Sequence, residues 1–104
     1  MPAGYGFHPE ALFEYEAAAH YYFTKASPKV AEAFITAVES AVAALVAAPE
    51  RCRVVEEPEI RRYLLSRFPF VIYYRWDEKH QRVSIYAIMH CSQEPGYWHS
   101  RAEE

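Results

Sequence analysis

The chain has 104 residues, of which 52% are hydrophobic and 16% aromatic, and its formal net charge is −3. This length predicts a single domain over residues 1–104 that buries about two-thirds of the surface of its unfolded chain, and the composition excludes intrinsic disorder. The acidic balance argues against broad nucleic-acid binding, so we expect no direct binding to DNA.

The sequence contains no signal for membrane insertion, secretion or metal binding. No apolar run approaches the roughly 18 residues that a membrane helix needs, and the first residues lack the basic and apolar pattern of a signal peptide. Cys52 and Cys91 lack the spacing of a metal site and are too few for a disulfide scaffold. We therefore expect a cytoplasmic protein with reduced thiols and with no metal, cofactor or membrane.

A short strand over residues 5–8 and a helix over residues 9–24 are predicted at the start of the chain. Pro9 suits the first helical position, where its missing N–H costs nothing, and Glu10 suits the positive end of the helix dipole. Apolar positions then recur at helical spacing, which predicts the face that packs on the core. Its members are Leu12, Tyr15, Ala19, Tyr22 and Phe23.

A second helix is predicted from Pro28 until Pro49 stops it. Ser27 directly before Pro28 is typical of a helix start, because serine caps the first turn and proline fits its first position. The connection to the first helix is so short that the two should form an antiparallel hairpin. The expected core face of the second helix is Val30, Phe34, Ala37, Val38, Ala41 and Leu45.

A loop over residues 49–59 and then three strands are predicted in the second half of the chain. The loop is bounded by Pro49 and Pro58, and the strands cover residues 61–65, 68–74 and 83–90. Short polar segments between the strands indicate tight reversals. Neighbouring strands should therefore run antiparallel.

Alternation along the last two strands assigns their side chains to two faces of the sheet. We expect the helical hairpin to cover the face that carries Phe70, Ile72, Tyr74, Trp76, Val83, Ile85, Ala87 and Met89. The opposite face should stay open to solvent or to a partner. Among its members are Tyr73, Arg75, Tyr86 and His90.

Positive charge is concentrated in the strand region. Residues 1–60 have a charge balance of −5, whereas residues 61–104 have a balance of +2. Arginine supplies most of the positive charge there, and its planar guanidinium suits bidentate contact with carboxylate or phosphate. The open face of the sheet is therefore the predicted site for an anionic partner.

Five short motifs, taken together in order, resemble the RelE/ParE toxins of bacterial type II toxin–antitoxin systems, and the ParE-like, plasmid-stabilisation group in particular. The resemblance runs from about residue 7 to residue 101. It implies an α+β domain of β-α-α-β-β-β order, with a mainly antiparallel sheet, a helical hairpin packed on one face, and a short antitoxin partner. The motifs are Phe7 to Ala11, Tyr21-Tyr22, Arg61-Arg62, Arg67 to Tyr74, and His90…Pro95-Gly96-Tyr97-Trp98…Arg101.

The RelE branch of this family cleaves messenger RNA on the ribosome with basic residues on the open sheet face. Such cleavage needs cations that stabilise the phosphate and a proton donor for the leaving oxygen. Here Val71 and Leu64 occupy positions where that branch has an arginine and a lysine. If the chain is a nuclease, the resemblance leaves Arg62, His90 and Tyr97 as its catalytic residues.

The ParE branch acts by binding a protein, DNA gyrase, and needs no catalytic set. The C-terminal residues Tyr97, Trp98 and Arg101 belong to the types that dominate protein-binding hot spots, so we expect them to contact the target. Gln93 stands where nearer relatives of the chain have an arginine. This replacement removes one cation from the C-terminal motif.

Some of these residues also have a purely structural interpretation. Trp98 packs the C-terminal segment onto the sheet in that interpretation, and His90 is a hydrogen-bonded residue at a strand end. Arg61 and Arg62 should lie on opposite faces of a regular strand, and the alternation does not say which one reaches the open face. The expected antitoxin-binding residues are Arg62, Arg67, Tyr73, Arg75 and Tyr86.

Three functions remain open from the sequence. The leading hypothesis is a ParE-like toxin that binds DNA gyrase and is neutralised by an antitoxin. The second is a RelE-like, ribosome-dependent endoribonuclease. The third, motivated by Gln93 and the acidic net charge, is a non-toxic family member that binds only an antitoxin.

Overall fold

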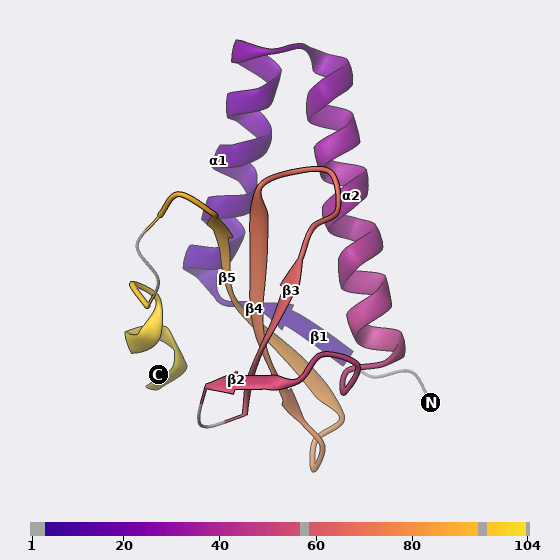
Figure 1. The fold of residues 1–104 in the computed structure, drawn as a ribbon, viewed down its shortest axis with the longest axis vertical. Coiled ribbons are helices and arrows are strands. Elements are labelled where there is room, and N and C mark those ends of the chain that lie inside the picture. The colour runs from indigo at the N-terminus through magenta and orange to yellow at the C-terminus, as the bar shows by residue number, and fades with distance from the viewer. Residues whose placement is uncertain (1–3, 57–58, 94–95, 104) are drawn as a thin grey trace.

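Two helices pack on one face of a five-stranded sheet in the computed structural model (Figure 1). The structure describes residues 4–56, 59–93 and 96–103, so Pro58 and Pro95 of the predictions above lie outside it. The elements are β1 Gly4–Phe7, α1 Pro9–Lys25, α2 Pro28–Ala47, β2 Val54–Glu56, β3 Ile60–Leu64, β4 Phe70–Asp77, β5 Arg82–His90 and a 3-10 helix His99–Glu103.

The strands lie in the order β1-β5-β4-β3-β2. β1 pairs with β5 in parallel, and every other neighbouring pair is antiparallel. The predicted α+β fold, with its mainly antiparallel sheet and helical hairpin, is therefore confirmed. The turn between α1 and α2 projects beyond the ends of β3, β4 and β5 (Figure 1).

Both helix starts follow the capping signals in the sequence. The Nδ1 atom of His8 accepts a hydrogen bond of 3.1 Å from the backbone N–H of Glu10, at the start of α1. The hydroxyl of Ser27 accepts one of 3.1 Å from the N–H of Val30, at the start of α2. In each helix, proline follows the cap at a position that needs no N–H.

The core face of α1 differs in part from the prediction. Tyr15 and Tyr22 pack against the core as expected, together with the fully buried Ala11. Leu12 and Phe23, however, are 43% and 55% exposed. Apolar residues occur on several faces of α1, so helical spacing alone is compatible with more than one buried face. Packing on the sheet decides which of these faces is buried.

α2 has the predicted length but contains a longer apolar stretch than was expected. It has 20 residues, and the most apolar 18-residue stretch within it has a mean hydropathy of 1.8, which by length and composition is enough to cross a membrane. The expectation that no such apolar segment exists is therefore wrong. The core helix of a soluble protein has the same two properties, and α2 packs on the sheet through Ala31, Phe34, Val38, Ala41, Val42 and Leu45, all of them buried.

β2 is a strand that the sequence analysis missed, because residues 49–59 were predicted to be a loop. Its residue Val54 pairs with Arg61, and Glu56 pairs with Ile60 across an irregularity in the register. A strand of three residues is too short to show a clear alternation of apolar and polar side chains.

A β-bulge at Tyr86 reverses the alternation of side chains along β5. Tyr74 pairs with Ile85 and Tyr73 pairs with Ala87, so Tyr86 is an extra residue between them. Ala87 and Met89 were predicted to share a face with Val83 and Ile85. They lie instead in the opposite cluster, while Ile88 joins the residues beneath the helices.

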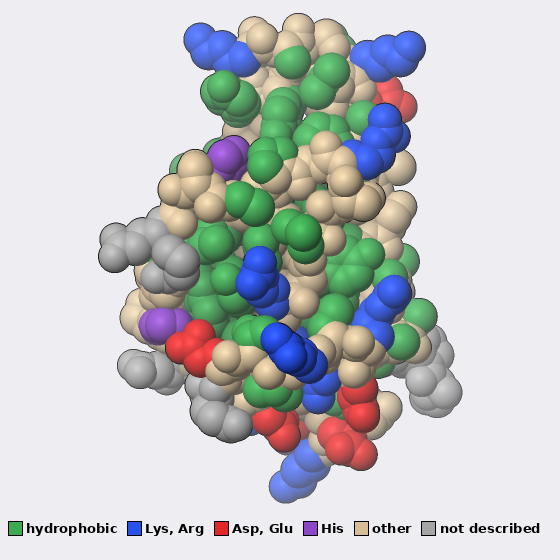
Figure 2. Space-filling view, viewed as in Figure 1, with side chains coloured by type: hydrophobic (Ala, Val, Ile, Leu, Met, Phe, Trp, Pro, Cys, Tyr) green, Lys and Arg blue, Asp and Glu red, His purple; other side chains and the backbone are tan. Residues whose placement is uncertain are grey.

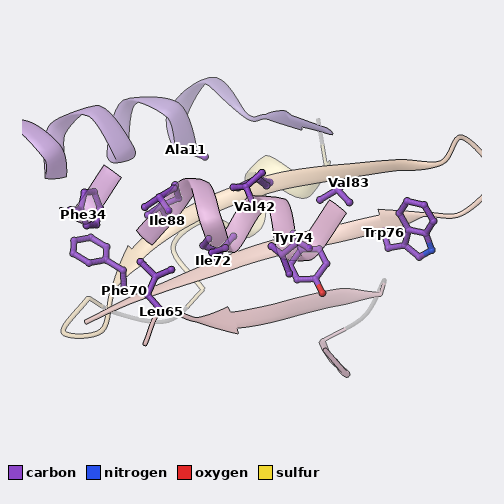
Figure 3. Close-up of a cluster of buried hydrophobic side chains, with 14 residues drawn as sticks. Ala11, Phe34, Val42, Leu65, Phe70, Ile72, Tyr74, Trp76, Val83 and Ile88 are labelled. Carbon is purple, nitrogen blue, oxygen red and sulfur yellow. The ribbon is translucent and has the colours of Figure 1, made fainter. Parts of the chain in front are cut away.

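The covered face of the sheet, which lies beneath α1 and α2, carries the larger hydrophobic cluster (Figure 3). Phe34 of α2 lies at its centre, because the ring centroids of Phe68 and Phe70 are 5.3 and 5.1 Å from its own. The hydroxyl of Tyr74 reaches the edge of this cluster and donates to the carbonyl of Pro49 at 3.0 Å. A smaller cluster lies on the opposite side, the open face.

Candidate functional site

The C-terminal segment, residues 96–103, folds back onto the open face. Trp98 is only 1% exposed, and its ring centroid lies 4.7 Å from that of Tyr73. The same cluster includes Val71, Ala87 and Met89. The expectation that Tyr73 is available to a partner is therefore wrong, since Trp98 covers it and leaves it 8% exposed. The structural interpretation of Trp98 is confirmed.

The carboxylate of Glu14 on α1 fastens this segment in place. It accepts hydrogen bonds from the hydroxyl of Tyr97 at 2.5 Å and from Nη1 and Nη2 of Arg101 at 3.0 and 3.1 Å. The side chains of Arg101 and Glu14 are 12% and 17% exposed, so water screens the pair only weakly. We call these contacts the Glu14 clasp.

The clasp also completes the edge of β5. The pairing of β1 with β5 ends at Ile85, which leaves the next backbone groups of β5 without a neighbouring strand. Nη1 of Arg101 donates to the carbonyl of Tyr86 at 3.0 Å, and Glu14 accepts from the N–H of Ile88 at 3.1 Å. Two side chains thereby satisfy backbone groups that an added strand would otherwise bind.

The environment of the clasp shifts the pKa values of its members. Burial, followed by the hydrogen bond to Glu14 and the negative charge of that carboxylate, raises the pKa of Tyr97 well above its ordinary value. Burial on its own would lower the pKa of Arg101, but the hydrogen bond to Glu14 and its charge outweigh this effect and raise it. Both groups therefore keep their protons at neutral pH.

The predicted target-binding residues are adjacent but unequally accessible. Tyr97 is 36% exposed, whereas Trp98 is buried and Arg101 is bonded to Glu14. In this conformation the Trp98 side chain has almost no exposed surface, so it cannot contact a target directly as expected. Sequence reasoning missed Glu14, because a glutamate in a helix, 83 residues before Tyr97, gives no local signal of such a contact.

The three candidate nuclease residues are not brought together. Arg62 is exposed on the open face, opposite Tyr73 in the register of β3 and β4. His90 was expected on that face too, but the bulge turns it to the covered side, where its ring packs against Phe70 with centroids 5.1 Å apart. Tyr97 lies beyond β5, with its hydroxyl bound to Glu14.

The polar contacts of His90 are local. Its Nδ1 atom lies 3.0 Å from the backbone N of Ser92 and 2.7 Å from the hydroxyl oxygen of that residue. The side-chain oxygen of Gln93 accepts a hydrogen bond of 2.8 Å from the N–H of His90. Gln93 therefore stabilises the turn after β5, a contact that an arginine, which has no acceptor, cannot make.

The arginines predicted to bind an antitoxin are on different sides of the sheet. Arg62 and Arg75 are on the open face, and the half-buried Tyr86 packs beside its cluster. Arg67 is exposed in the β3–β4 connection and lines a hollow along α2. Arg61 faces the covered side, where it donates to the carbonyls of Cys52 and Glu50, so the open face carries Arg62 and not Arg61.

Within the described ranges, no three His, Cys, Asp or Glu side chains are grouped so that they could hold a metal ion. Cys52 is half-buried, Cys91 is exposed, and both are free thiols. The residues gathered at the open face are instead aromatic rings and guanidinium groups. Such a surface is suited to contact with a protein or an anionic group.

The fold resembles solved toxin structures. A protein described as the chromosomal ParDE system of P. aeruginosa superposes with a TM-score of 0.71 at 22% identity, covering 85% of this chain and 95% of that chain. A mutant of E. coli RelE in the free state has a TM-score of 0.66 at 16% identity, covering 99% and 96%. The RelBE2 toxin–antitoxin complex of Mycobacterium tuberculosis has a TM-score of 0.58 at 22% identity, covering 86% and 99%.

Comparison with curated protein sequences finds no significant match. The sequence profile of one family, described as the ParE toxin of the parDE type II toxin–antitoxin system, matches residues 5–95. This match includes both helices and all the strands except the first residue of β1. The chain therefore belongs to the ParE toxin family of type II toxin–antitoxin systems.

Proposed function

We propose that this toxin acts by binding DNA gyrase and that it has no nuclease activity. The observation that carries the proposal is the separation of Arg62, His90 and Tyr97, which occupy the open face, the covered face and the edge beyond β5. A nuclease site needs its cation and its proton donor on the same phosphate. Val71 is buried and Leu64 is 57% exposed, so neither position supplies a cation.

The C-terminal segment is the proposed target-binding element. Trp98 and the Glu14 clasp hold it on the sheet, so it is ordered before a target arrives. Preordering reduces the conformational entropy that binding costs. Tyr97 and the exposed His99 are the side chains of this segment that a target can contact, while Trp98 and Arg101 act by positioning them.

A short antitoxin is the proposed partner that neutralises the toxin, in the cytoplasm. The ParDE and RelBE2 names of the structural relatives describe toxins paired with antitoxins, which supports this partner. The surface residues that remain for it are Arg62, Arg67, Arg75 and Tyr86. Co-expression with the antitoxin should yield one complex, and separate elution of the two proteins at micromolar concentration would contradict this assignment.

Induced expression without antitoxin tests the mechanism. Growth arrest with DNA damage, together with altered supercoiling by purified gyrase, is the expected result. Truncation after Gly96 should abolish both effects, provided that the shortened protein melts cooperatively. Arrest of translation with cleaved ribosome-bound messenger, lost in Arg62→Ala or Tyr97→Phe, would instead support the ribonuclease. Normal growth at high expression would support the non-toxic alternative.

A further inference from the structure

Three arginines of the open face form no ion pair with a described acidic side chain. Arg62 of β3, Arg75 of β4 and Arg82 of β5 form no ion pair or hydrogen bond through their side chains with any described residue. Figure 2 shows Lys and Arg side chains among hydrophobic ones over the strands of the sheet. We call Arg62, Arg75 and Arg82 the arginine strip.

The strip follows a diagonal of the sheet. Arg62 pairs with Tyr73, Arg75 lies two residues further along β4, and Arg82 pairs with Asp77, two residues further again. The three arginines thus occupy successive diagonal positions on β3, β4 and β5. Diagonal neighbours in a sheet are about 7–8 Å apart, which is close to the roughly 6.7 Å between alternate residues of an extended peptide.

Acidic side chains at the rim of the open face already have partners. The carboxylate of Asp77 lies 2.7 Å from Nδ1 of His80, and that of Glu56 lies 2.7 Å from Nε2 of His99. Neither carboxylate forms an ion pair with the arginine strip, although Asp77 lies opposite Arg82. The hydrogen bond to His80 and, to a smaller extent, the charge of Arg75 lower the pKa of Asp77. Three guanidinium groups therefore face one neighbouring carboxylate, which leaves an excess of positive charge along the diagonal.

The unsatisfied buried atoms on this face are hydrogen-bond donors. Nε of Arg75 and Nε1 of Trp98 are buried and have no acceptor among the described residues. These two atoms are out of reach of a ligand, so the exposed Arg62 and Arg82 and the half-buried Arg75 present the donors of this face. A carboxylate, which only accepts hydrogen bonds when ionised, is the side-chain group that matches such a surface.

A hollow of about 250 Å³ lies at the Arg82 end of the strip. Gly6, Ser84 and the guanidinium of Arg101 line it together with Arg82. A Cβ atom on Gly6 would clash with Nη2 of Arg82, so glycine at this position lets the guanidinium lie over β1. Since Glu14 already offsets the charge of Arg101, Arg82 provides most of the attraction for an anion.

We propose that an extended acidic segment of the antitoxin lies diagonally across β3, β4 and β5. Acidic side chains at alternate positions pair with Arg62, Arg75 and Arg82, and the last of them enters the hollow beside Ser84. The assignment of this segment to the antitoxin rests on the proposed function. The surface itself specifies the pattern acid-x-acid-x-acid.

Titration with short peptides tests the surface directly. The probes are capped Glu-Ser-Glu-Ser-Glu and capped Ser-Glu-Glu-Glu-Ser, which have equal charge and different spacing, and an oligothymidylate of the same charge. Amide chemical shifts of the full chain report binding at low and high salt. We expect the alternating peptide to bind tightest, to shift residues of β3, β4 and β5, and to weaken with salt.

Three variants and one control sharpen this test. Arg75→Gln and Arg82→Gln should each weaken binding of the alternating peptide by about tenfold. Gly6→Ala should weaken it as well, because the new methyl group displaces the flexible end of Arg82 at little cost in stability. Lys29→Gln removes one positive charge at the start of α2, away from the strip, and should leave binding within about twofold.

The proposal is overturned if both peptides bind equally, if Lys29→Gln matches Arg82→Gln, or if the oligothymidylate binds as tightly as the alternating peptide. The last result would indicate a nucleic-acid phosphate as the ligand. The titration involves neither gyrase nor ribosomes, so a failure of the proposed mechanism leaves its result standing. Unchanged affinity of the Arg82→Gln toxin for its antitoxin would overturn the antitoxin assignment alone.

Discussion

The two faces of the sheet are built differently. The covered face is closed by two helices and a continuous cluster of aromatic and aliphatic side chains. The open face is closed in part by Trp98, and its remaining surface carries unpaired guanidinium groups. The covered face therefore supplies most of the hydrophobic core, whereas the open face carries the surface that we propose for recognition. Substitutions on the two faces should therefore have separable effects.

The largest loss of stability is expected on the covered face. Phe34 is fully buried between α2 and the sheet, so Phe34→Ala should lower the free energy of unfolding by about 3–5 kcal/mol. Urea denaturation measures the change. A loss below about 1 kcal/mol would show that the covered face is not the main source of stability.

A smaller loss is expected for the other large buried ring. Trp98→Ala removes the side chain that covers Tyr73, and burial of one such side chain contributes about 1.5–3 kcal/mol. The cost should be lower than that of Phe34→Ala, because the C-terminal segment can detach and expose the vacated surface to water. Faster hydrogen exchange confined to residues 96–103 and the β5 edge is the expected signature. Exchange that accelerates throughout α2 would contradict it.

The Glu14 clasp joins the two faces, and its charge can be removed without changing its shape. Glu14→Gln leaves Arg101 poorly compensated and should lower stability by about 1–2 kcal/mol. Glu16→Gln, on the exposed side of the same helix, is the matched control and should change stability by less than about 0.5 kcal/mol. In the gyrase assay, Glu14→Gln should weaken inhibition, while Glu16→Gln should not. Equal effects of the two variants would show that the clasp has no positioning role.

The smallest effect should appear only at alkaline pH. Because the pKa of Tyr97 is raised above its ordinary value of 10.0, its contribution to stability is complete below pH 10 and is lost as the pH rises further. Tyr97→Phe should therefore reduce the loss of stability between about pH 10 and pH 11.5, as followed by urea denaturation. Tyr74 has a raised pKa as well, through burial and its hydrogen bond with Cys52. The double variant with Tyr74→Phe should flatten the profile further, and an unchanged slope would contradict this account.

The helices and the main strands could be predicted from the sequence because their signals are local. Ser27 and Pro28 lie next to each other at the start of α2, and Phe70, Ile72 and Tyr74 alternate within a single strand. Capping and alternation act over a few residues, so the sequence alone displays them. The same reasoning placed the helical hairpin on the correct face of β4.

The site depends on contacts that local signals do not report. The bulge at Tyr86 turns His90 away from Arg62, and it arises from pairing with β4 and leaves no distinct pattern within β5. Glu14 contacts Tyr97 and Arg101 because the C-terminal segment folds back onto the open face, which brings residues 83 and 87 positions apart together. The sequence by itself therefore determined the two helices, the main strands, the family resemblance and the positive charge of the strand region. Tertiary structure decided which side chains stay accessible, because accessibility follows from packing between residues far apart in the chain.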